Sequence, residues 1–500
     1  MLGQPHSMRR LFVAILAAVG LLVVALLANT FRHGSKQMTV PPLAKLAVDT
    51  DGAAQSLAAA VQAKTVSGLL NPEGTAAEFD KLHEHLRHRY PLVHEKLQRE
   101  VVGAHSLLYT WKGSQPQLKA LVLMAHQDVV PIAPGTEAQW KQPPFSGTIE
   151  GGRVWGRGSW DDKGNLIAQL EAVEMLLKAG FQPQRTVLLA FGHDEEVGGK
   201  AGAVKIAELL KARGTPIESV IDEGLVVTEG ILPGVAQPIA LIGVAEKGYA
   251  SLRLVATGTP GHSSMPPPGA GQSAIGALSQ ALARLDAQPV PGGITGVAHE
   301  MFTTLAPELP LGQRVAMSNL WLLGPVVERM LSKAPGTNAL MRTTTAMTIV
   351  NAGNKENVLP GRAEAIVNFR LLPGDTAESV EAHVRKAIAD DRITIERLPD
   401  TAPASKVSSS TGEAYKRIER ATREVFPDAM VAPGLMLGGT DGRHFDGIAD
   451  AVYRYTPIRA DSEKLKLFHG TDEHVTVDSL ADMIRFYHRL VQLAASAPNP

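Results

Sequence analysis

The chain contains no cysteine. Disulfides and thiolate metal sites are therefore excluded, and the sequence is compatible with either an oxidising or a reducing compartment. The chain also lacks an excess of charge of either sign, because 49 Lys and Arg residues balance 50 Asp and Glu residues, for a net charge of -1. No basic field is available to hold nucleic acid, so that class of partner is excluded.

Size and composition indicate a globular protein with a large core. The chain has 500 residues, of which 44% are hydrophobic and 20% charged. This length exceeds that of a typical single domain and predicts more than one folded unit. The sequence contains no internal repeat and no low-complexity tract.

The N-terminus carries a targeting signal. Arg9 and Arg10 precede an apolar run from Leu11 to Ala28. We interpret residues 1–29 as an uncleaved signal anchor, or transmembrane helix, and residues 30–52 as a linker. A cleaved signal peptide is the alternative, although Leu26 disrupts the best small-x-small cleavage site. The rest of the chain is expected outside the cytoplasm: periplasmic, luminal, or secreted if the segment is cleaved.

Residues 53–246 and 399–500 are predicted to form one α/β domain. Continuous apolar runs at residues 120–125 and 186–191 are typical of strands buried on both faces. Residues 165–179 have helical spacing and end at Gly180. Strands that alternate with helices predict a doubly wound, mostly parallel sheet, in which functional sites form beyond the carboxyl ends of the strands.

Residues 247–398 have a different pattern and are predicted to form an inserted lid or dimerisation domain. Their strand-like and helical segments follow one another in the order β-α-β-β-α-β, which is typical of a ferredoxin-like α+β fold. Within this range, residues 289–335 are rich in Pro and Gly. We expect them to form an extended insertion without regular elements.

Metal-binding side chains follow several of the hydrophobic runs. Asp128 follows His126 at the end of one predicted strand, at a spacing suited to fix the histidine tautomer for metal binding. Asp222 follows another strand, and His469 follows a largely apolar segment. Each of these residues could instead be an ordinary loop or structural residue. As a set, they indicate a site for two divalent metals of the zinc type.

Further carboxylates complete this set. Asp161 follows a glycine turn and precedes a helix, so it could bridge two metals or cap the helix. A phosphate-binding loop is disfavoured there because the Walker spacing is absent. Glu195 and Glu196 follow a buried strand and could divide the roles of general base and metal ligand. An acidic surface loop is the alternative for that pair.

A second group of histidines lies on the helix predicted for residues 78–101. His83, His85, His88 and His94 stand among many Lys, Arg and Glu residues. We interpret this group as a solvated helix face rather than a metal site.

At this point the chain resembles the aminoacylase and carboxypeptidase family of two-zinc hydrolases. It is most similar to the group that includes N-fatty-acyl amino acid hydrolase/synthases and Gly-Xaa carboxypeptidases. The resemblance spans residues 55–495 and rests on these blocks: MAHQDVVP, PPFSG, WGRGSWDDKG, GHDEEVGG, VIDEG, AEKGYASL, GHSSMPP, RTTTA, NVLP, VNFRLLPGDT, GGTDGRHF and FHGTDEH.

The resemblance implies two zinc ions, with Co²⁺ or Mn²⁺ as alternatives. It assigns His126 and Asp222 to one ion, Glu196 and His469 to the other, and Asp161 to both. Glu195 would be the general base, and Asp128 would support His126. The resemblance also implies a cis peptide bond between Asp161 and Asp162.

Other matched residues imply how a substrate would be held. His262 would stabilise an oxyanion in a partner's active site, which implies a homodimer formed through the lid. Asn357 and Arg370, with Gly439 and Thr440, would bind the substrate carboxylate, to which a guanidinium is well matched.

The implied activity is hydrolysis of an amide next to a free carboxylate, in a dipeptide, a peptide or an N-acyl amino acid. The acyl group, and the balance between hydrolysis and condensation, stay open at this stage. Removal of an acyl group from a biosynthetic intermediate is one alternative. A non-catalytic binding protein on the same fold is another.

Overall fold

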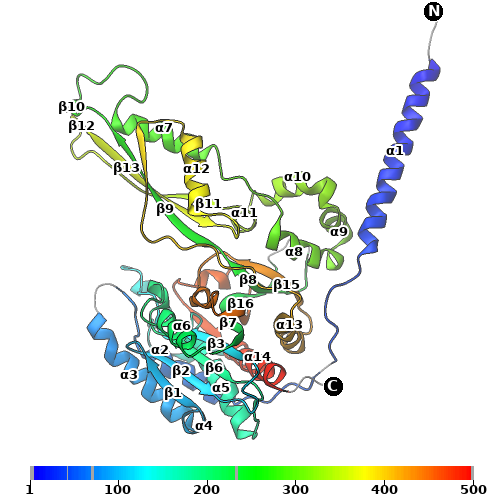
Figure 1. Ribbon diagram of the computed structural model, residues 1–500, viewed down its shortest axis with the longest axis vertical. Coiled ribbons are helices and arrows are strands. Elements are labelled where there is room, and N and C mark those ends of the chain that lie inside the picture. The colour runs from blue at the N-terminus through cyan, green and yellow to red at the C-terminus, as the bar shows by residue number, and fades with distance from the viewer. Residues whose placement is uncertain (1–4, 42, 69–71, 231–234, 497–500) are drawn as a thin grey trace, which may run out of the picture.

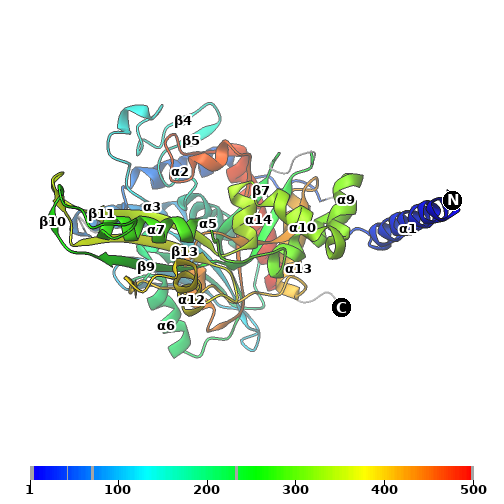
Figure 2. The ribbon, with the colours of Figure 1, turned by 90° about the horizontal axis from the view of Figure 1, so that it is seen from above.

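The computed structural model of the protein describes residues 5–41, 43–68, 72–230 and 235–496. It contains two bodies and a long N-terminal helix whose N-terminal part projects away from both of them (Figure 1). The larger body is built around an eight-stranded sheet and carries both sequence segments that were predicted to form the α/β domain. The smaller body has a four-stranded sheet and projects from it (Figure 2).

The large sheet is mixed, with a parallel centre. Its strands lie in the order β1-β2-β6-β3-β7-β16-β8-β15. Their bounds are β1 Gln98–Val102, β2 Ser106–Trp111, β6 Val187–Gly192, β3 Ala120–His126, β7 Ile217–Thr228, β16 Ala449–Ala460, β8 Ile239–Glu246 and β15 Met430–Met436. Strands β6, β3, β7 and β16 are parallel neighbours, whereas β1, β2 and β6 pair antiparallel. The predicted α/β class is confirmed, with more antiparallel pairing at the edge than we expected.

Alternate residues of the central strands pack against helices on opposite faces. One face is covered by α2, α5, α13 and α14, and the other by α6. Leu121 and Leu123 of β3 belong to the first core, and Val122 and Met124 to the second. Helices of this body are α2 Thr50–Gln62, α3 Pro72–Arg89, α4 Pro91–Lys96, α5 Lys163–Lys178, α6 Ala203–Ala212, α13 Glu413–Val425 and α14 Val477–Ala495. Burial on both faces explains the uninterrupted apolar runs in the sequence.

The smaller body has the predicted β-α-β-β-α-β order. Its elements are β9 Gly248–Thr257, α7 Ala274–Asp286, β11 Thr344–Ala352, β13 Arg362–Leu371, α12 Ala377–Ile388 and β14 Ile393–Arg397. The sheet order is β11-β13-β9-β14, with every neighbouring pair antiparallel, and α7 and α12 share its core. A short ribbon of β10 Gly261–His262 and β12 Val358–Leu359 lies at its far end (Figure 1).

The expectation of an extended insertion at residues 289–335 is wrong. The segment forms helices α8 Gly296–Leu305, α9 Leu311–Ser318 and α10 Leu320–Leu331, followed by α11 Pro335–Met341. Their apolar side chains pack with Ile239, Met430 and Ala432 of β8 and β15, so these helices cover the edge of the large sheet rather than the small one. Pro325 misled the prediction, because it lies inside α10 although it has no N–H to donate.

Helix α1 (Pro5–Arg32) contains an apolar segment, Arg9–Arg32, with a mean hydropathy of 3.1 over its most apolar window, none of which is buried. Its length and composition suit either a membrane span or a signal sequence. The last turn of α1 contacts α9.

Three short strands, β4 Ile149–Glu150, β5 Arg153–Trp155 and β17 His474–Thr476, form a separate small sheet.

A matched pair of substitutions tests how far the double burial of the central strands stabilises the fold. Val220 of β7 is fully buried, whereas Val101 of the edge strand β1 is half exposed. We expect Val220→Ala to lower the free energy of unfolding by about 2 kcal/mol, because two buried methyl groups and their contacts are lost. Val101→Ala should change it by less than about 0.5 kcal/mol. Urea unfolding followed by circular dichroism measures both. Equal losses of stability would contradict the conclusion that the doubly buried central strands stabilise the fold more than the edge strand does.

Candidate metal centre

The segments singled out in the sequence converge at one edge of the large sheet. His126 ends β3, Asp161 lies in the turn before α5, and Glu195 and Glu196 follow β6. His469 arrives from the loop before β17. The carboxyl ends of parallel strands share one edge of a sheet, and this brings the segments together.

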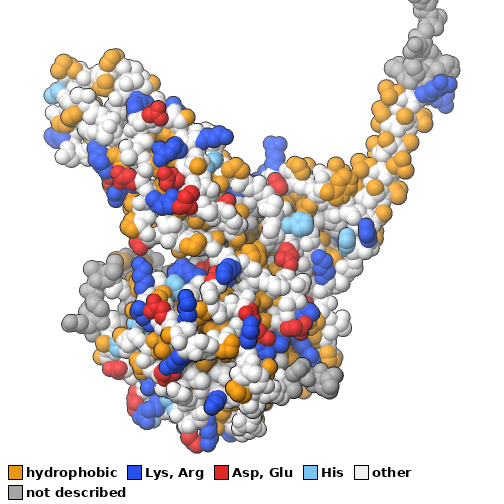
Figure 3. All heavy atoms as spheres, viewed as in Figure 1, with side chains coloured by type: hydrophobic (Ala, Val, Ile, Leu, Met, Phe, Trp, Pro, Cys, Tyr) orange, Lys and Arg blue, Asp and Glu red, His pale blue; other side chains and the backbone are white. Residues whose placement is uncertain are grey.

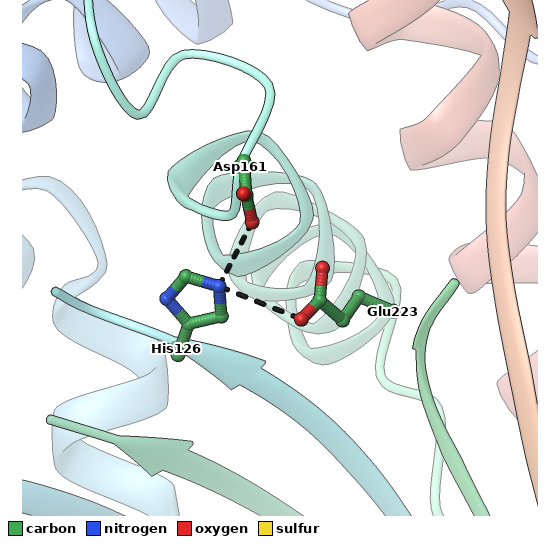
Figure 4. Close-up of side chains that lie close together, drawn as sticks. All are labelled: His126, Asp161 and Glu223. Carbon is green, nitrogen blue, oxygen red and sulfur yellow. Dashed lines mark hydrogen bonds and ion pairs between the residues drawn. The ribbon is translucent and has the colours of Figure 1, made fainter. Parts of the chain in front are cut away.

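The first cluster of possible ligands consists of His126, Asp161 and Glu223 (Figure 4). His126 Nε2 lies 2.9 Å from Asp161 Oδ1 and 3.6 Å from Glu223 Oε1. All three residues are buried. The imidazole and the two carboxylates therefore point at one small volume from three different elements.

The second cluster consists of Asp161, Glu196 and His469. His469 Nε2 lies 2.8 Å from Asp161 Oδ2 and 3.4 Å from Glu196 Oε2. Asp161 belongs to both clusters and turns one carboxylate oxygen to each histidine. The expected convergence of Asp161 and His469 is confirmed.

The structure places Glu223, rather than the predicted ligand Asp222, in the first cluster. Neighbouring strand residues point to opposite faces. Glu223 shares the face of Ile221, on the side of α5, which Asp161 precedes. The Asp222 carboxylate instead accepts the main-chain N–H groups of Gly442, at 2.6 Å, and of Glu223, at 2.9 Å.

Asp128 connects the two halves of the site. His126 Nδ1 donates to the main-chain oxygen of Asp128 at 2.9 Å and lies 3.4 Å from its Oδ1, which leaves Nε2 facing the cluster. The Asp128 carboxylate also accepts the main-chain N–H groups of Glu195 and Glu196, at 3.1 and 3.2 Å. Asp128 therefore orients the histidine and the glutamate turn together.

Glu473 holds the backbone at Asp161, and we did not identify it from the sequence. Its Oε1 accepts the main-chain N–H groups of Trp160 and Asp161 at 2.9 and 3.2 Å, and its Oε2 accepts Arg157 Nη1 at 2.5 Å. The peptide bond between Asp161 and Asp162 is cis, as the resemblance implied. Its position in the block FHGTDEH, four residues after His469, was the feature of the sequence that could have identified Glu473.

The site gathers more negative charge than its surroundings can solvate. Burial, reinforced by Asp441 and Glu196, raises the pKa of Glu195 well above its usual range. Burial and the nearby Asp161 do the same to the pKa of Glu223. Buried carboxylates of this kind are stabilised when a cation shares the site. Nitrogen and oxygen donors without sulfur suit Zn²⁺, Co²⁺ or Mn²⁺.

The pKa values of the two histidines are raised as well, because the neighbouring carboxylates favour the protonated imidazoles. Hydrogen bonds to Asp161 and Glu196 raise the pKa of His469 to about 10. Burial lowers the pKa of His126, but hydrogen bonds to Asp128 and Asp161 outweigh it and raise that pKa well above its usual value. The protons on both Nε2 atoms lie where cations would bind, so metal binding at this site displaces protons. The donor set therefore fits a pair of divalent ions.

A cavity of about 340 Å³ opens onto these groups. It is lined by Asp161, Glu195, Glu196, Glu223 and His469, and also by Arg370, Gly439 and Arg443. The Arg370 guanidinium, from β13 of the smaller body, lies 5.0 Å from the centre of the Tyr249 ring. Thr440 does not line this cavity; its N–H and hydroxyl both donate to the buried Glu246. Of the predicted carboxylate-binding residues, the structure places Arg370 and Gly439 at the cavity.

His262 and Asn357 lie elsewhere. Both are exposed on the β10–β12 ribbon and its loop, at the end of the smaller body that points away from the large sheet (Figure 1). His262 Nδ1 lies 2.8 Å from Ser264 Oγ, and the Asn357 main-chain oxygen accepts the N–H of Ser263. Within one chain these residues do not join the metal centre.

The solvated-face interpretation of this histidine group is right for the exposed His88 and wrong for the other three. His94, in α4, is partly buried, and its Nδ1 donates to the main-chain oxygen of Tyr90 at 2.9 Å. His83 and His85 are partly buried, and their Nε2 atoms bond to Gln127 Oε1 at 2.7 Å and to Ser56 Oγ at 3.0 Å. Burial lowers the pKa of His83 to about 4. These side chains form hydrogen bonds within the fold and belong to no ligand cluster among the described residues.

Comparison with known proteins agrees with this geometry. Residues 122–493 match the family described as "Peptidase family M20/M25/M40". The chain is 39% identical over 489 residues to a probable carboxypeptidase S-like protein of Dictyostelium discoideum, covering 95% of this chain and 92% of that protein. It is 39% identical over 454 residues to the N-fatty-acyl-amino acid synthase/hydrolase of Mus musculus, covering 89% and 88% of the two chains.

A solved structure shows the same fold. The M20 family metallo-carboxypeptidase Sso-CP2 of Sulfolobus solfataricus superposes with a TM-score of 0.63 at 21% identity, covering 89% of this chain and 99% of that one. The family match covers well over half of the sequence, and the relatives match along nearly their whole length. This chain therefore belongs to peptidase family M20/M25/M40 and is a metallohydrolase of the carboxypeptidase and aminoacylase type.

Proposed function

We propose that the protein hydrolyses the amide bond next to a free carboxylate, with N-acyl amino acids of apolar acyl chain as its main substrates. Dipeptides and peptide C-termini present the same bond and carboxylate. The observation that carries the proposal is the sharing of Asp161 by two ligand clusters in one cavity with Glu195 and Arg370.

The ligand assignment follows from the two clusters. His126 and Glu223 would hold one zinc ion, Glu196 and His469 the other, and Asp161 both, with Co²⁺ or Mn²⁺ as alternative ions. Bound there, the pair would supply Lewis acidity and a water molecule of lowered pKa.

Glu195 is suited to the role of general base. Its carboxylate lines the cavity, and burial raises its pKa above that of a free carboxyl group, which makes it a stronger proton acceptor. It takes a proton from the attacking water as the water oxygen bonds to the amide carbon. It then delivers that proton to the amide nitrogen as the carbon–nitrogen bond breaks. The same steps in reverse would condense an acid with an amine.

Arg370 supplies the positive charge for the substrate carboxylate. It is the arginine that the smaller body contributes to the cavity, which Gly439 also lines. The neighbouring Thr440 is hydrogen-bonded to Glu246. A guanidinium binds a carboxylate through two parallel hydrogen bonds, which fixes the amide at a set distance from Glu195.

A second cavity supports an apolar acyl group. It has a volume of about 230 Å³ and shares Glu223, Met436 and Phe468 with the cavity of the metal centre. Most of its remaining wall is apolar, with Leu225, Val226, Leu241 and Leu465 among the lining residues. An aliphatic chain on the acyl side of the scissile amide would be stabilised there by burial. The mouse relative is named for a synthase/hydrolase activity on N-fatty-acyl amino acids.

The remote position of His262 supports a homodimer in which each smaller body completes the site of the partner. Strand β11 is an edge strand, and its Met347, Ile349 and Val350 are exposed. Unpaired edges with apolar residues are suited to pairing with a second copy. In such a dimer His262 would donate to the oxyanion and Asn357 would support substrate binding, while the smaller body closes over the cavity as a lid.

We also propose that α1 is an uncleaved membrane anchor and that the two bodies lie outside the cytoplasm. Support comes from the apolar segment Arg9–Arg32, whose most apolar window contains no buried residue. Cleavage of the segment would release the same enzyme as a secreted protein.

Neighbouring substitutions on β7 test the ligand assignment. Glu223→Ala should lose about one of two bound zinc ions per chain, because a direct ligand is removed. Asp222→Asn should retain both, since its carboxylate accepts hydrogen bonds from Gly442 and Glu223 instead. Metal content after dialysis, measured by plasma mass spectrometry, distinguishes them. If Asp222→Asn lost zinc and Glu223→Ala did not, Asp222 would be the ligand instead of Glu223.

Paired changes in enzyme and substrate test the role of Arg370. Arg370→Met should lower kcat/KM for N-oleoyl-leucine by about 10- to 100-fold, the range expected for a lost hydrogen bond to a charged group. Amidation of the substrate carboxylate should lower it similarly in the wild type, and the two changes together should add little further loss. Independent, additive losses would remove Arg370 from this role. Dipeptides and short N-acetyl amino acids in the same assay rank the acyl groups.

Mixing two inactive variants tests both the general base and the dimer. Glu195→Gln should retain zinc and lose activity by at least about 100-fold, the lower range for general-base catalysis. His262→Ala should also be poorly active. In a two-fold dimer refolded from equal amounts, half the molecules are mixed and have one complete site in two, so about one quarter of wild-type turnover should return. Activity no higher than that of the separate variants would place His262 outside the partner's site.

A further inference from the structure

The helices α9 and α10 present an apolar surface that none of the described residues covers. Trp321, Val326 and Met330 of α10 are 66%, 60% and 65% exposed, and Leu311 of α9 is 58% exposed. Leu322, also exposed, lies four residues before Val326 and eight before Met330, so the three share one helix face. Figure 3 shows hydrophobic side chains gathered over α10 and along α1. We call α9 and α10 together the helical hairpin.

The hairpin is tied to the end of α1 by buried polar contacts. Asn319, between α9 and α10, donates from Nδ2 to the main-chain oxygen of Leu26 at 3.2 Å and to Thr30 Oγ1 at 3.0 Å. Asn29 Nδ2 donates to the main-chain oxygen of Ser318 at 2.7 Å. Asn319 and Thr30 have no exposed surface. These bonds fix the level of the hairpin along the axis of α1.

The hairpin therefore contacts α1 within its apolar segment and not after the end of that segment. Leu26 precedes Arg32, the last residue of α1, by six residues, which corresponds to about 9 Å along a helix axis. Helices that lie in a membrane interface bury their apolar face by about 5–10 Å. A bilayer that contains α1 up to Arg32 therefore reaches the exposed face of the hairpin.

The charged residues around the patch fit this position. Arg329 and Lys333 are exposed beside the apolar face, and Arg314 lies over the Phe31 ring at 5.1 Å. Glu328, the acidic residue of α10, turns away from the patch and accepts the N–H of Ile294. An apolar face with a tryptophan and a cationic border is typical of helices at a lipid headgroup boundary.

We infer that the hairpin is a second membrane-binding element, which inserts its apolar face into the leaflet where α1 ends. The inference rests on the proposed function in one respect, namely that α1 is a membrane anchor. Docking at two points holds the body in one orientation. It also places the membrane close to the apolar cavity, because Leu241 lines that cavity and packs against the cluster that includes Met317 and Leu320 of the hairpin. A lipophilic acyl chain would then travel only a short distance from the bilayer to the site.

The absence of cysteine allows a direct test on the full-length protein. Val326→Cys and the control Val101→Cys replace residues that are 60% and 50% exposed, and Val101 lies in β1 at the opposite end of the larger body (Figure 1). Each variant is labelled with a nitrobenzoxadiazole fluorophore and reconstituted with phosphatidylcholine vesicles. We expect lipids with brominated acyl chains to quench the label at residue 326 several-fold more than the label at residue 101, with iodide showing the opposite order.

A third label, on Val19→Cys in α1, separates the two proposals. If label 19 is quenched by brominated lipid and label 326 behaves like label 101, docking of the hairpin is wrong while the anchor stands. If label 19 is also aqueous, the anchor and the docking both fail. If label 326 is shielded from iodide without being quenched by brominated lipid, a protein surface such as a second copy covers the patch, and the inference is overturned. None of these readouts depends on turnover, so failure of the hydrolase proposal would be seen separately.

The unlabelled protein provides a second measurement if a cysteine variant does not fold. Trp321 is the strongly exposed tryptophan, whereas Trp111, Trp140 and Trp160 are buried and Trp155 is intermediate. Brominated lipid should quench part of the tryptophan emission of the wild type, and Trp321→Phe should abolish most of that quenching. Equal quenching in the two proteins would contradict the insertion of the hairpin.

Discussion

The carboxylate of Asp161 stands between two histidines that come from opposite ends of the sequence. One oxygen lies 2.9 Å from His126 Nε2 and the other 2.8 Å from His469 Nε2. This arrangement requires β3, the turn before α5 and the loop before β17 to meet within a few ångströms. Glu473 binds the backbone at Asp161, and Asp128 orients both His126 and the turn of Glu195 and Glu196. Much of the surrounding hydrogen bonding serves to hold this carboxylate and its partners in place.

The same constraint explains why the site is electrostatically unusual. Several carboxylates are buried together at the edge of a sheet, where burial raises the pKa values of Glu195 and Glu223. Carboxylates on a flexible, solvent-exposed loop could move apart, whereas carboxylates fixed at the ends of parallel strands cannot. Bound cations would stabilise this buried negative charge, and the fold holds Glu195, which we propose as the general base, beside the two ligand clusters. Both bodies contribute to the site, since the larger body carries the two clusters of possible ligands and β13 of the smaller body carries Arg370.

Much of the fold and of the site could be predicted from the sequence, for reasons that are local. Strands buried on both faces read as uninterrupted apolar runs, and ligands follow directly after them, as His126 follows residues 120–125. The alternation of strands and helices gave the α/β class and the order of the smaller body. The exchange of Asp222 for Glu223 shows the limit of this approach. Two adjacent acids on one strand differ only in the face to which they point, and that depends on where α5 lies.

The sequence by itself determined the type of the central strands and their helices, the chemistry of the donors and the family, because these follow from residue identity and short spacings. Only the tertiary structure decided which of two neighbouring acids joins the cluster, that residues 296–341 form helices on the edge of the large sheet, and that His262 lies far from the metal centre of its own chain. It also decided that the end of α1 is hydrogen-bonded to the loop between α9 and α10. Such contacts join residues up to several hundred positions apart, and their geometry is set by packing, which no local pattern encodes.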